Sequence, residues 1–454
     1  MKLTVPPLEI APNEGFSPDK DIFERKAFGR NILNIIENIN DELVLAIDAP
    51  WGEGKTTFIK MWRGMLAGEG IKSIYFDAFE NDYQEDSFLA IAAEIYSIID
   101  DKKEEEKSQF KEKTVSALKI LGRAGSRIVT KSLIGFALDD TFFDDTNTIK
   151  DVSKEASDLV DSYVDKRLEN AKQDKQSLLE FKESLDNLAS TIGNDKPLIF
   201  IIDELDRCKP PFALAILENI KHLYSVKNIV FVLVLNRNQI EESVKCEYGS
   251  GVEASKYLQK FVHLWASLPK RKDKYKSDAE EYLLYCLQRM DFKANNSAQQ
   301  QSLKTYQQLV VHYNLSLREI ERTLTNFSLV YNMTAGKLDE CYRLILVYLS
   351  IIKVINPEIF NKLSNNDISY QELVQETSLK TLEDESWLIN YHIDKHPLTY
   401  LLHYCLTSQQ EYIKFLEESK RESSFNNFRN IFTAQNRDLV KKTCKWMNTF
   451  KTTL

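Results

Sequence analysis

The chain has 454 residues, of which 43% are hydrophobic and 28% are charged, with a formal net charge of −9 and a pI near 5.5. This composition excludes a disordered chain and leaves room for about two to four domains. The acidic balance argues against a protein that binds nucleic acid over its whole surface, although a local basic face stays open.

Targeting and redox features favour a cytoplasmic protein. The six cysteines contain no Cys-x-x-Cys pair, a spacing that fits reduced, buried thiols better than disulfides or zinc. The first ten residues, MKLTVPPLEI, lack the basic and then apolar pattern of a signal peptide. No uninterrupted apolar run approaches the ~20 residues that span a bilayer, so we expect no integral membrane helix.

Helices and strands alternate in the first hundred residues. A proline-containing lead-in over 1–20 precedes a helix that starts near Ile22, in which Phe28, Ile32 and Ile36 recur at helical spacing. The elements expected after it are a strand over 43–48, a helix to about residue 67, a strand over 71–76 and a helix over 88–99.

Residues 101–190 differ in character. The charge run 101–113 suggests a solvated segment, and 151–191 suggests a long helix. The apolar stretch 114–138 carries a cation at every fourth position, which places these cations on one helix face. They are Lys119, Arg123, Arg127 and Lys131. Two interpretations stay open: a surface helix packed on the body of the protein, or a basic amphipathic helix that contacts a membrane surface or a partner.

The strands expected over 198–202 and 229–235, with a helix over 211–224 between them, are apolar throughout. Such strands belong to a parallel sheet whose two faces are covered by helices. Strand signals end near residue 270, and helical patterns follow. The predicted domains are 1–100 and 191–270 as the two halves of a core, 101–190 as a helical insertion, 271–355 as a helical lid and 356–454 as a C-terminal helical domain.

A phosphate-binding loop lies between the first strand and its helix. The segment reads Asp48-Ala49-Pro50-Trp51-Gly52-Glu53-Gly54-Lys55-Thr56-Thr57. Backbone N–H groups of 52–56 would surround a β-phosphate, Lys55 would reach the β/γ oxygens, and the Thr56 hydroxyl would hold Mg²⁺. Residues 50–57 are the candidate nucleotide ligands. Ala49 stands where a first Gly is common. The alternative, a Gly-rich turn that only caps a helix, does not explain Lys-Thr-Thr at this spacing.

Two carboxylates end the strand over 198–202. Because ligands of open α/β sheets bind at the carboxyl ends of strands, Asp203 and Glu204 should face the same crevice as Lys55. Asp203 would hold Mg²⁺ through water, and Glu204 is the candidate general base for attack of water on the γ-phosphate. The alternative is an acidic turn in which Asp206 pairs with Arg207.

Three further contacts are less specific. Asn236, at the end of the strand over 229–235, is expected to orient the attacking water, and a helix N-cap is nearly as good an interpretation. An arginine usually neutralises the transition state, and the candidates are Arg207, Arg318 and Arg322. Arg318 is the main candidate, and it would act on the nucleotide of its own subunit (in cis) or of a neighbouring subunit (in trans). Arg25, at the start of the first helix, is the candidate for contact with the base.

Four segments together resemble the KAP family of P-loop NTPases. They are Ala49-Pro50-Trp51-Gly52-Glu53-Gly54-Lys55-Thr56, Tyr75-Phe76-Asp77-Ala78-Phe79-Glu80, Ile202-Asp203-Glu204-Leu205-Asp206-Arg207-Cys208, and Tyr257-Leu258-Gln259-Lys260-Phe261 running on to Leu268-Pro269. Residues 316–325 are similar to the arginine-bearing helix of the family. The resemblance covers about residues 20–330, and the segments follow one another along the chain in the same order as in the family.

This resemblance implies an α/β P-loop NTPase with a three-layer αβα core and a parallel sheet, which binds and hydrolyses ATP-Mg²⁺. The chain departs from the family in two ways. Members commonly carry transmembrane helices where this chain has residues 101–190, which contain no apolar run long enough to span a membrane. Glu204 and Asn236 replace residues that are often Asp in the family. The resemblance further implies a homo-oligomer that controls an effector protein in bacterial anti-phage defence. The alternatives are an ATP-binding scaffold or switch without turnover, a nucleic-acid-stimulated ATPase, and a peripheral membrane protein.

Overall fold

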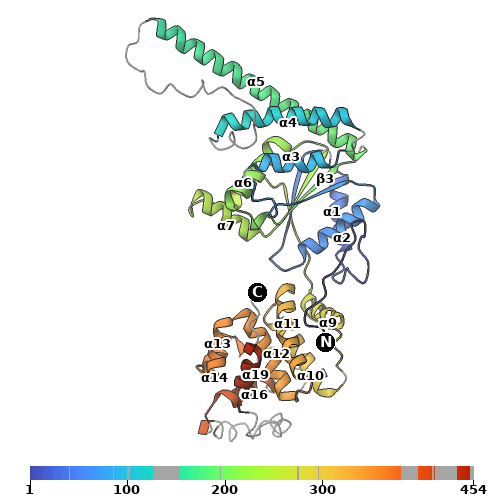
Figure 1. Cartoon of the computed structure of the whole chain (residues 1–454), viewed down its shortest axis with the longest axis vertical. Helices are drawn as coiled ribbons and strands as arrows, with labels where there is room; N and C mark the ends of the chain where they lie inside the picture. Colours follow the sequence, from blue (N-terminus) through green and yellow to red (C-terminus); the bar gives the residue numbers. More distant parts are fainter. Residues whose placement is uncertain are drawn as a thin grey trace. The chain divides into compact units, whose positions relative to one another are not determined.

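The computed structural model describes residues 1–39, 41–84, 86–99, 103–125, 154–194, 196–273, 276–294, 296–379, 397–408, 410–411, 414 and 437–449. The chain forms two compact units, Ile10–Pro269 and Met1–Glu9 with Lys270–Leu454 (Figure 1). The first unit contains the phosphate-binding loop and the acidic motif.

A five-stranded parallel sheet forms the centre of the first unit. Its strands are β1 (Leu43–Asp48), β2 (Ser73–Asp77), β3 (Leu198–Asp203), β4 (Ile229–Leu235) and β5 (Leu264–Ser267), in the order β2-β3-β4-β1-β5. In register, Asp77 lies opposite Asp203, and Asp48 lies opposite Leu235. The carboxyl ends of these strands therefore bring three acids to one edge of the sheet.

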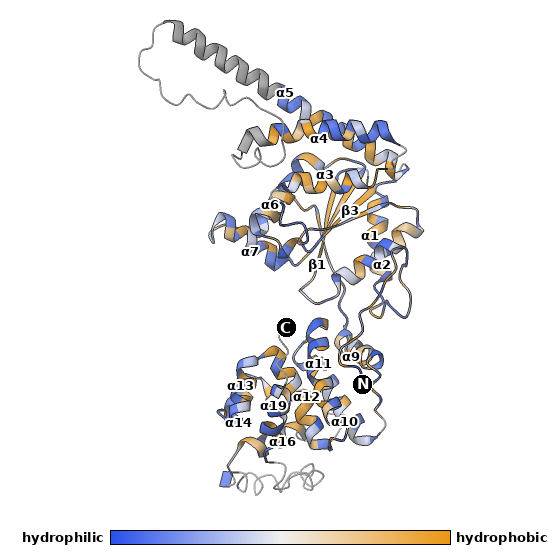
Figure 2. Ribbon diagram, viewed as in Figure 1, coloured by the Kyte–Doolittle hydropathy of each residue, from blue (hydrophilic) through white to orange (hydrophobic). Residues whose placement is uncertain are grey.

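Two hydrophobic cores lie on opposite faces of this sheet because successive strand side chains alternate in direction. One core joins Leu45 and Ile47 of β1 to α1 (Lys26–Glu37) and α2 (Lys55–Gly68). The other joins the intervening strand residues to α3 (Ser87–Ser97), α6 (Pro210–Asn219), α7 (Arg237–Tyr248) and α8 (Ala254–Leu258). Figure 2 shows the strands as the apolar centre between these helices. The predicted three-layer αβα fold is confirmed.

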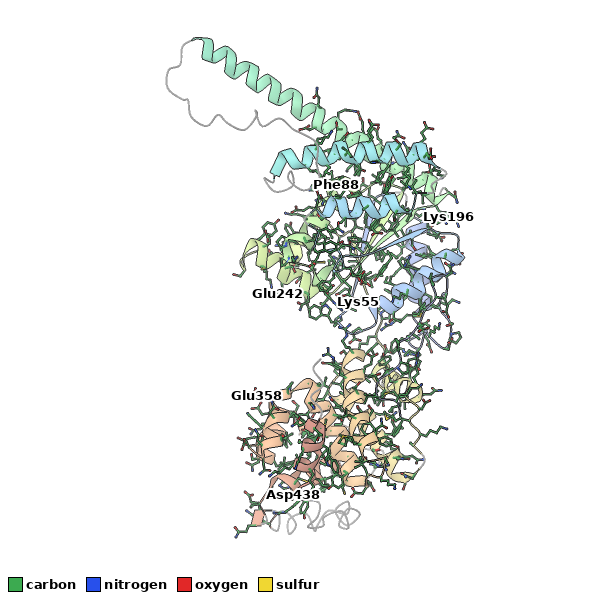
Figure 3. The ribbon with its side chains drawn as sticks, viewed as in Figure 1. Lys55, Phe88, Lys196, Glu242, Glu358 and Asp438 are labelled. Carbon is green, nitrogen blue, oxygen red and sulfur yellow. The ribbon has the colours of Figure 1, made fainter. Side chains whose placement is uncertain are left out.

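The insertion consists of α4 (Glu104–Gly125) and α5 (Lys154–Gly193), which pack on each other and on α3. Phe88 of α3, labelled in Figure 3, packs against the insertion, with its ring centroid 5.4 Å from that of Phe181 in α5. The charge run is solvated as predicted over 104–113, where every residue but Phe110 is exposed or half-buried, and it is helical. Three glutamates in the first turn favour a helix there, since acids stabilise helix N-termini.

The predicted cationic face of 114–138 lies partly outside the described residues, which include neither Arg127 nor Lys131. Its two interpretations therefore stay predictions. Among the described helices, none combines the length and the apolar composition needed to cross a membrane. Four of the six cysteines are buried as expected, Cys405 is half-buried, and Cys246 is exposed, which corrects the expectation of buried thiols at that position.

The second unit is helical around a core of its own, whose centre is the apolar helix α12 (Glu340–Ile355). The other helices that contribute to this core are α9 (Asp278–Arg289), α10 (Ser297–His312), α11 (Leu317–Met333), α13 (Pro357–Asn365), α14 (Tyr370–Glu376), α16 (Pro397–Leu406) and α19 (Leu439–Thr449). Two-residue strands, β6 (Lys272–Asp273) and β7 (Lys276–Ser277), precede α9, where no strand is expected from the sequence. The first residues of the chain join this unit: the Lys2 amide donates to the Met290 carbonyl at 2.7 Å.

Several boundaries differ from the predictions. Helix α1 begins at Lys26, and not near Ile22, because the two Asp21 carboxylate oxygens accept the Arg25 and Lys26 amides and hold a turn there. Helix α6 ends at Asn219, and a π-helical turn, η3 (Ile220–Tyr224), follows. Strand β5 and helices α7 and α8 are absent from the sequence prediction. β5 is only four residues long and half-buried, so it lacks the continuous apolar run of β3 and β4.

Candidate nucleotide-binding site

The phosphate-binding loop has the backbone that a phosphate cradle needs. Gly52 and Gly54 have φ angles of 80° and 79°, a left-handed conformation that favours glycine. Ala49 is not among the positive-φ residues, and its amide donates to the Leu235 carbonyl at 3.2 Å. Position 49 therefore continues the strand pairing and has no need of glycine, which explains the departure from the usual motif.

Lys55 opens α2 and points back over its own loop. Its Nζ donates to the Ala49 carbonyl at 2.6 Å and to the Pro50 carbonyl at 3.3 Å. Burial lowers the pKa of Lys55, and the carboxylates of Asp206, Asp203, Glu204 and Asp48 oppose that effect. The Lys55 ammonium is thus buried, is bonded to neutral carbonyls and has carboxylates around it. Charged phosphate oxygens would form stronger hydrogen bonds with it than these carbonyls do.

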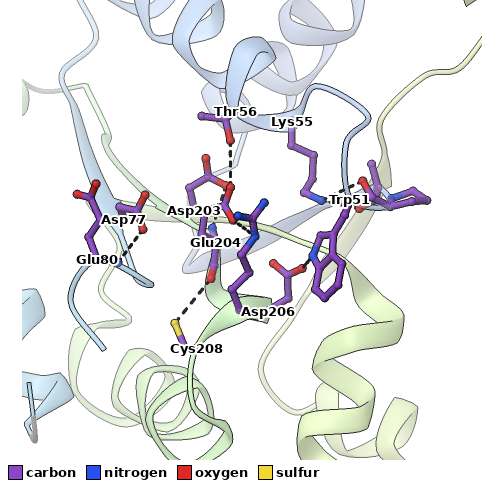
Figure 4. A network of polar contacts seen from close by, with 12 residues as sticks. Trp51, Lys55, Thr56, Asp77, Glu80, Asp203, Glu204, Asp206 and Cys208 are labelled. Carbon is purple, nitrogen blue, oxygen red and sulfur yellow. Dashed lines mark hydrogen bonds and ion pairs between the residues drawn. The ribbon is translucent and has the colours of Figure 1, made fainter. Parts of the chain in front are cut away.

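Asp203 and Glu204 lie beside the first turn of α2 (Figure 4). Asp203 is fully buried at the end of β3, and the Glu204 amide donates to its Oδ1 at 2.9 Å. Glu204 has a φ of 61°, a conformation that costs a residue with a side chain about 1–3 kcal/mol. Its Oε1 accepts from the Thr56 hydroxyl at 3.5 Å. The structure thus brings Thr56 and both predicted acids together.

These oxygens fit Mg²⁺. The ion prefers hard oxygen donors, and the Thr56 hydroxyl and the Asp203 carboxylate offer two of them on facing elements. Burial raises the pKa of Asp203, and hydrogen bonds from Thr56 and Tyr75 oppose that rise. Burial also raises the pKa of Glu204, against the effect of Arg207. A divalent cation bound here would offset the cost of burying these carboxylates.

The turn after β3, η2 (Leu205–Arg207), connects the acids to the loop. The Trp51 Nε1–H donates to Asp206 Oδ2 at 2.5 Å, and the Arg207 guanidinium forms an ion pair with Glu204. The alternative in which Asp206 pairs with Arg207 is therefore wrong. Asp206 pairs with Trp51, and Arg207 pairs with Glu204. The left-handed backbone at Glu204 turns the chain so that Arg207 lies against the Glu204 side chain.

The remaining candidate residues have the following positions. Arg25 is buried, and its Nη1 donates to the Glu53 carbonyl at 3.0 Å, which places it against the loop. Asn236 is the N-cap of α7, and its side chain accepts the Asn238 amide at 3.2 Å. Thr57 lies in the first turn of α2. Arg318 and Arg322 are exposed on α11 of the second unit. The roles of Arg25, Asn236 and Arg318 toward nucleotide or water stay predictions.

Sequence reasoning missed Tyr75 as a member of the site. Tyr75 lies on β2, two residues before its end, and its hydroxyl donates to Asp203 Oδ2 at 3.1 Å. The available signal was the alternation of β2, which puts Tyr75 and Asp77 on the same face of the sheet, next to β3.

Comparison with known proteins gives one family. The model of the "KAP family P-loop domain" matches residues 25–334, about two thirds of the chain. No curated protein sequence matches. Among solved structures, the chain is similar to the ORC2 protein of Aeropyrum pernix in its ADPNP–ADP complexes, with 13% identity, 94% of each chain covered and a TM-score of 0.35.

Proposed function

Because the chain belongs to the KAP family of P-loop NTPases, we propose that it binds ATP with Mg²⁺ and hydrolyses the γ-phosphate. The observation that carries this proposal is the meeting of Lys55, Thr56, Asp203 and Glu204 at one edge of the sheet, with Thr56 Oγ1 3.5 Å from Glu204 Oε1. Lys55 and the loop amides bind the phosphates. Thr56 and Asp203 would hold Mg²⁺, which supplies charge neutralisation on the phosphate oxygens.

Glu204 is proposed as the general base. A carboxylate beside the phosphate loop can accept a proton from water as the water attacks the γ-phosphate. Arg207 forms an ion pair with this carboxylate and opposes the rise in its pKa that burial causes, so it favours the ionised form that a base needs.

The test compares wild type with Glu204→Gln. Phosphate release should fall by about 100-fold or more, because a general base typically contributes that much, while ATP binding is retained. The control is Glu242→Gln, an exposed residue of α7 whose carboxylate pairs with Lys245. Equal phosphate release from wild type and Glu204→Gln would overturn the hydrolysis proposal.

Turnover is proposed to drive a conformational or assembly switch that controls an effector protein, in a cytoplasmic homo-oligomer with a role in bacterial anti-phage defence. The support is the family and the helices outside the core, which offer surfaces apart from the nucleotide site. A pull-down with Glu204→Gln held in ATP should enrich one protein that the Lys55→Met variant does not enrich.

The alternatives give different results in the same assays. A scaffold or switch without turnover binds ATP, and its wild-type form releases no phosphate above background. A nucleic-acid-stimulated ATPase shows higher turnover with DNA or RNA, and the increase weakens steeply with salt.

A further inference from the structure

A tyrosine hydroxyl holds the buried acid of the site. Tyr75 OH donates to Asp203 Oδ2 at 3.1 Å, while the Glu204 amide donates to Asp203 Oδ1 at 2.9 Å. Each carboxylate oxygen thus has its own donor. An aspartate carboxylate otherwise rotates broadly about its last torsion, so two donors from different elements fix its plane.

The fold brings Tyr75 to this position through strand pairing. β2 pairs with β3 in parallel, with Tyr75 opposite Ile201 and Asp77 opposite Asp203. Tyr75 therefore lies two residue pairs before the carboxyl end of the sheet, on the face covered by α2, and its long side chain reaches forward to the acid. Thr56, in the first turn of α2, approaches Asp203 from the same face.

Tyr75 is itself supported. The Arg63 guanidinium of α2 lies over its ring at 5.3 Å from the centroid, and Arg63 Nε donates to Ser73 Oγ at 3.4 Å. A phenol hydroxyl keeps its proton at neutral pH, and a carboxylate oxygen accepts, so Tyr75 acts toward Asp203 as a donor.

We propose that Tyr75 is a positioning residue for Mg²⁺, which orients the Asp203 carboxylate toward Thr56 and the metal of the bound nucleotide. This inference rests on the proposed function. Groups that hydrogen-bond a metal-binding side chain fix its orientation, and their loss commonly costs 10- to 100-fold in metal affinity. Because the Tyr75 hydroxyl bonds to Asp203, its loss should act through this metal-binding side chain and should leave nucleotide binding without metal unchanged.

The test measures binding of a fluorescent, non-hydrolysable ATP analogue to the full chain, first in EDTA and then during a Mg²⁺ titration. Tyr75→Phe should bind the analogue in EDTA as wild type does and should need about 10- to 100-fold more Mg²⁺ to reach the tight complex. The matched control is Tyr257→Phe, which also loses a hydroxyl donated to a carboxylate at 3.1 Å, that of Glu218, and should follow the wild-type titration.

A second variant without the hydroxyl is Tyr75→Leu, in which the packing of the ring is changed as well. The unfolding temperature of each variant, measured without nucleotide, checks that it is folded. Both Tyr75 variants should show the shifted Mg²⁺ requirement. A wild-type Mg²⁺ titration in folded Tyr75→Phe, or weaker binding of that variant already in EDTA, would overturn the inference and leave the proposed function intact. A wild-type protein that does not bind the analogue with or without Mg²⁺ would overturn the proposed function, and the inference with it.

Discussion

At the scale of single residues, the site depends on side chains that are held by the protein before any phosphate arrives. Lys55 is bonded to two carbonyls of its loop, Trp51 to Asp206, and Arg207 to Glu204. The motif residues Lys55, Thr56, Asp203 and Glu204 were predictable because their spacing after strands is typical of a nucleotide site. The contacts of Tyr75 with Asp203 and of Trp51 with Asp206 were not predictable, because they join residues 128 and 155 positions apart.

Lys55→Met removes the charged donor that the phosphate-binding loop is expected to offer to the β/γ oxygens. Hydrogen bonds to charged groups contribute about 1.5–3 kcal/mol each, so ATP affinity should fall by roughly 10- to 150-fold. Isothermal titration calorimetry measures the change. Lys60→Met, on the exposed side of the same helix, is the control and should bind as wild type does. Unchanged affinity in Lys55→Met would contradict the assignment of the loop.

At the scale of elements, α2 is held by the segment that precedes α1. A Cβ added at Gly64 would lie 2.1 Å from the Glu14 carbonyl oxygen and 2.6 Å from the Gly15 amide nitrogen, whereas one added at Gly68 meets nothing within 4 Å. The sequence predicts an extended lead-in over 1–20 but does not reveal that its backbone lies directly on α2.

Gly64→Ala should therefore destabilise the protein by at least about 1–3 kcal/mol, the usual cost of overpacking, because two backbones must separate. Gly68→Ala in the same helix should be neutral or stabilising by up to about 1 kcal/mol, since alanine favours helix. Urea unfolding followed by circular dichroism compares the two. Equal free energies of unfolding would show that the contact with Glu14 is unimportant.

Helix α11, which carries Arg318, begins with a capping box. The Ser316 hydroxyl accepts the Glu319 amide, and the Glu319 carboxylate accepts the Ser316 amide at 2.8 Å. Ser316→Ala should cost about 0.5–2 kcal/mol. Thr325→Ala, within the same helix, loses a hydroxyl bond to the Glu321 carbonyl but gains helix propensity, so it should change stability less. The same urea titration measures both, and a smaller loss for Ser316→Ala than for Thr325→Ala would be inconsistent with the cap.

At the scale of the whole molecule, the chain has two units with separate cores, and the candidate arginine Arg318 belongs to the unit without the phosphate loop. Arg318 is proposed to act on the nucleotide of its own subunit or on that of a neighbouring subunit, and the two arrangements give different results when variants are mixed. An arginine supplied to the transition state can be worth about 10³-fold or more in turnover.

Mixing two inactive variants tests the arrangement in trans. Glu204→Gln keeps the arginine, and Arg318→Ala keeps the base, so a mixed homo-oligomer should regain phosphate release at those sites where an intact base meets an intact arginine. The control mixes Glu204→Gln with Lys55→Met; both changes affect the loop-containing site, so neither subunit supplies an intact one. Failure to recover activity in the first mixture at any ratio would rule out Arg318 acting from a neighbour.

Sequence by itself determined the parallel core and the motif residues of the site. Continuous apolar runs specify β3 and β4, and a Gly-rich turn with Lys-Thr specifies the loop, because these signals lie within a few consecutive residues. Only the tertiary structure decided that Ala49 continues the strand, that Glu204 has a left-handed backbone, and that Tyr75 holds Asp203. The positions of Ala49 and Tyr75 depend on pairing between β1 and β4 and between β2 and β3, and the sequence of one strand alone does not specify its partner strand or its register.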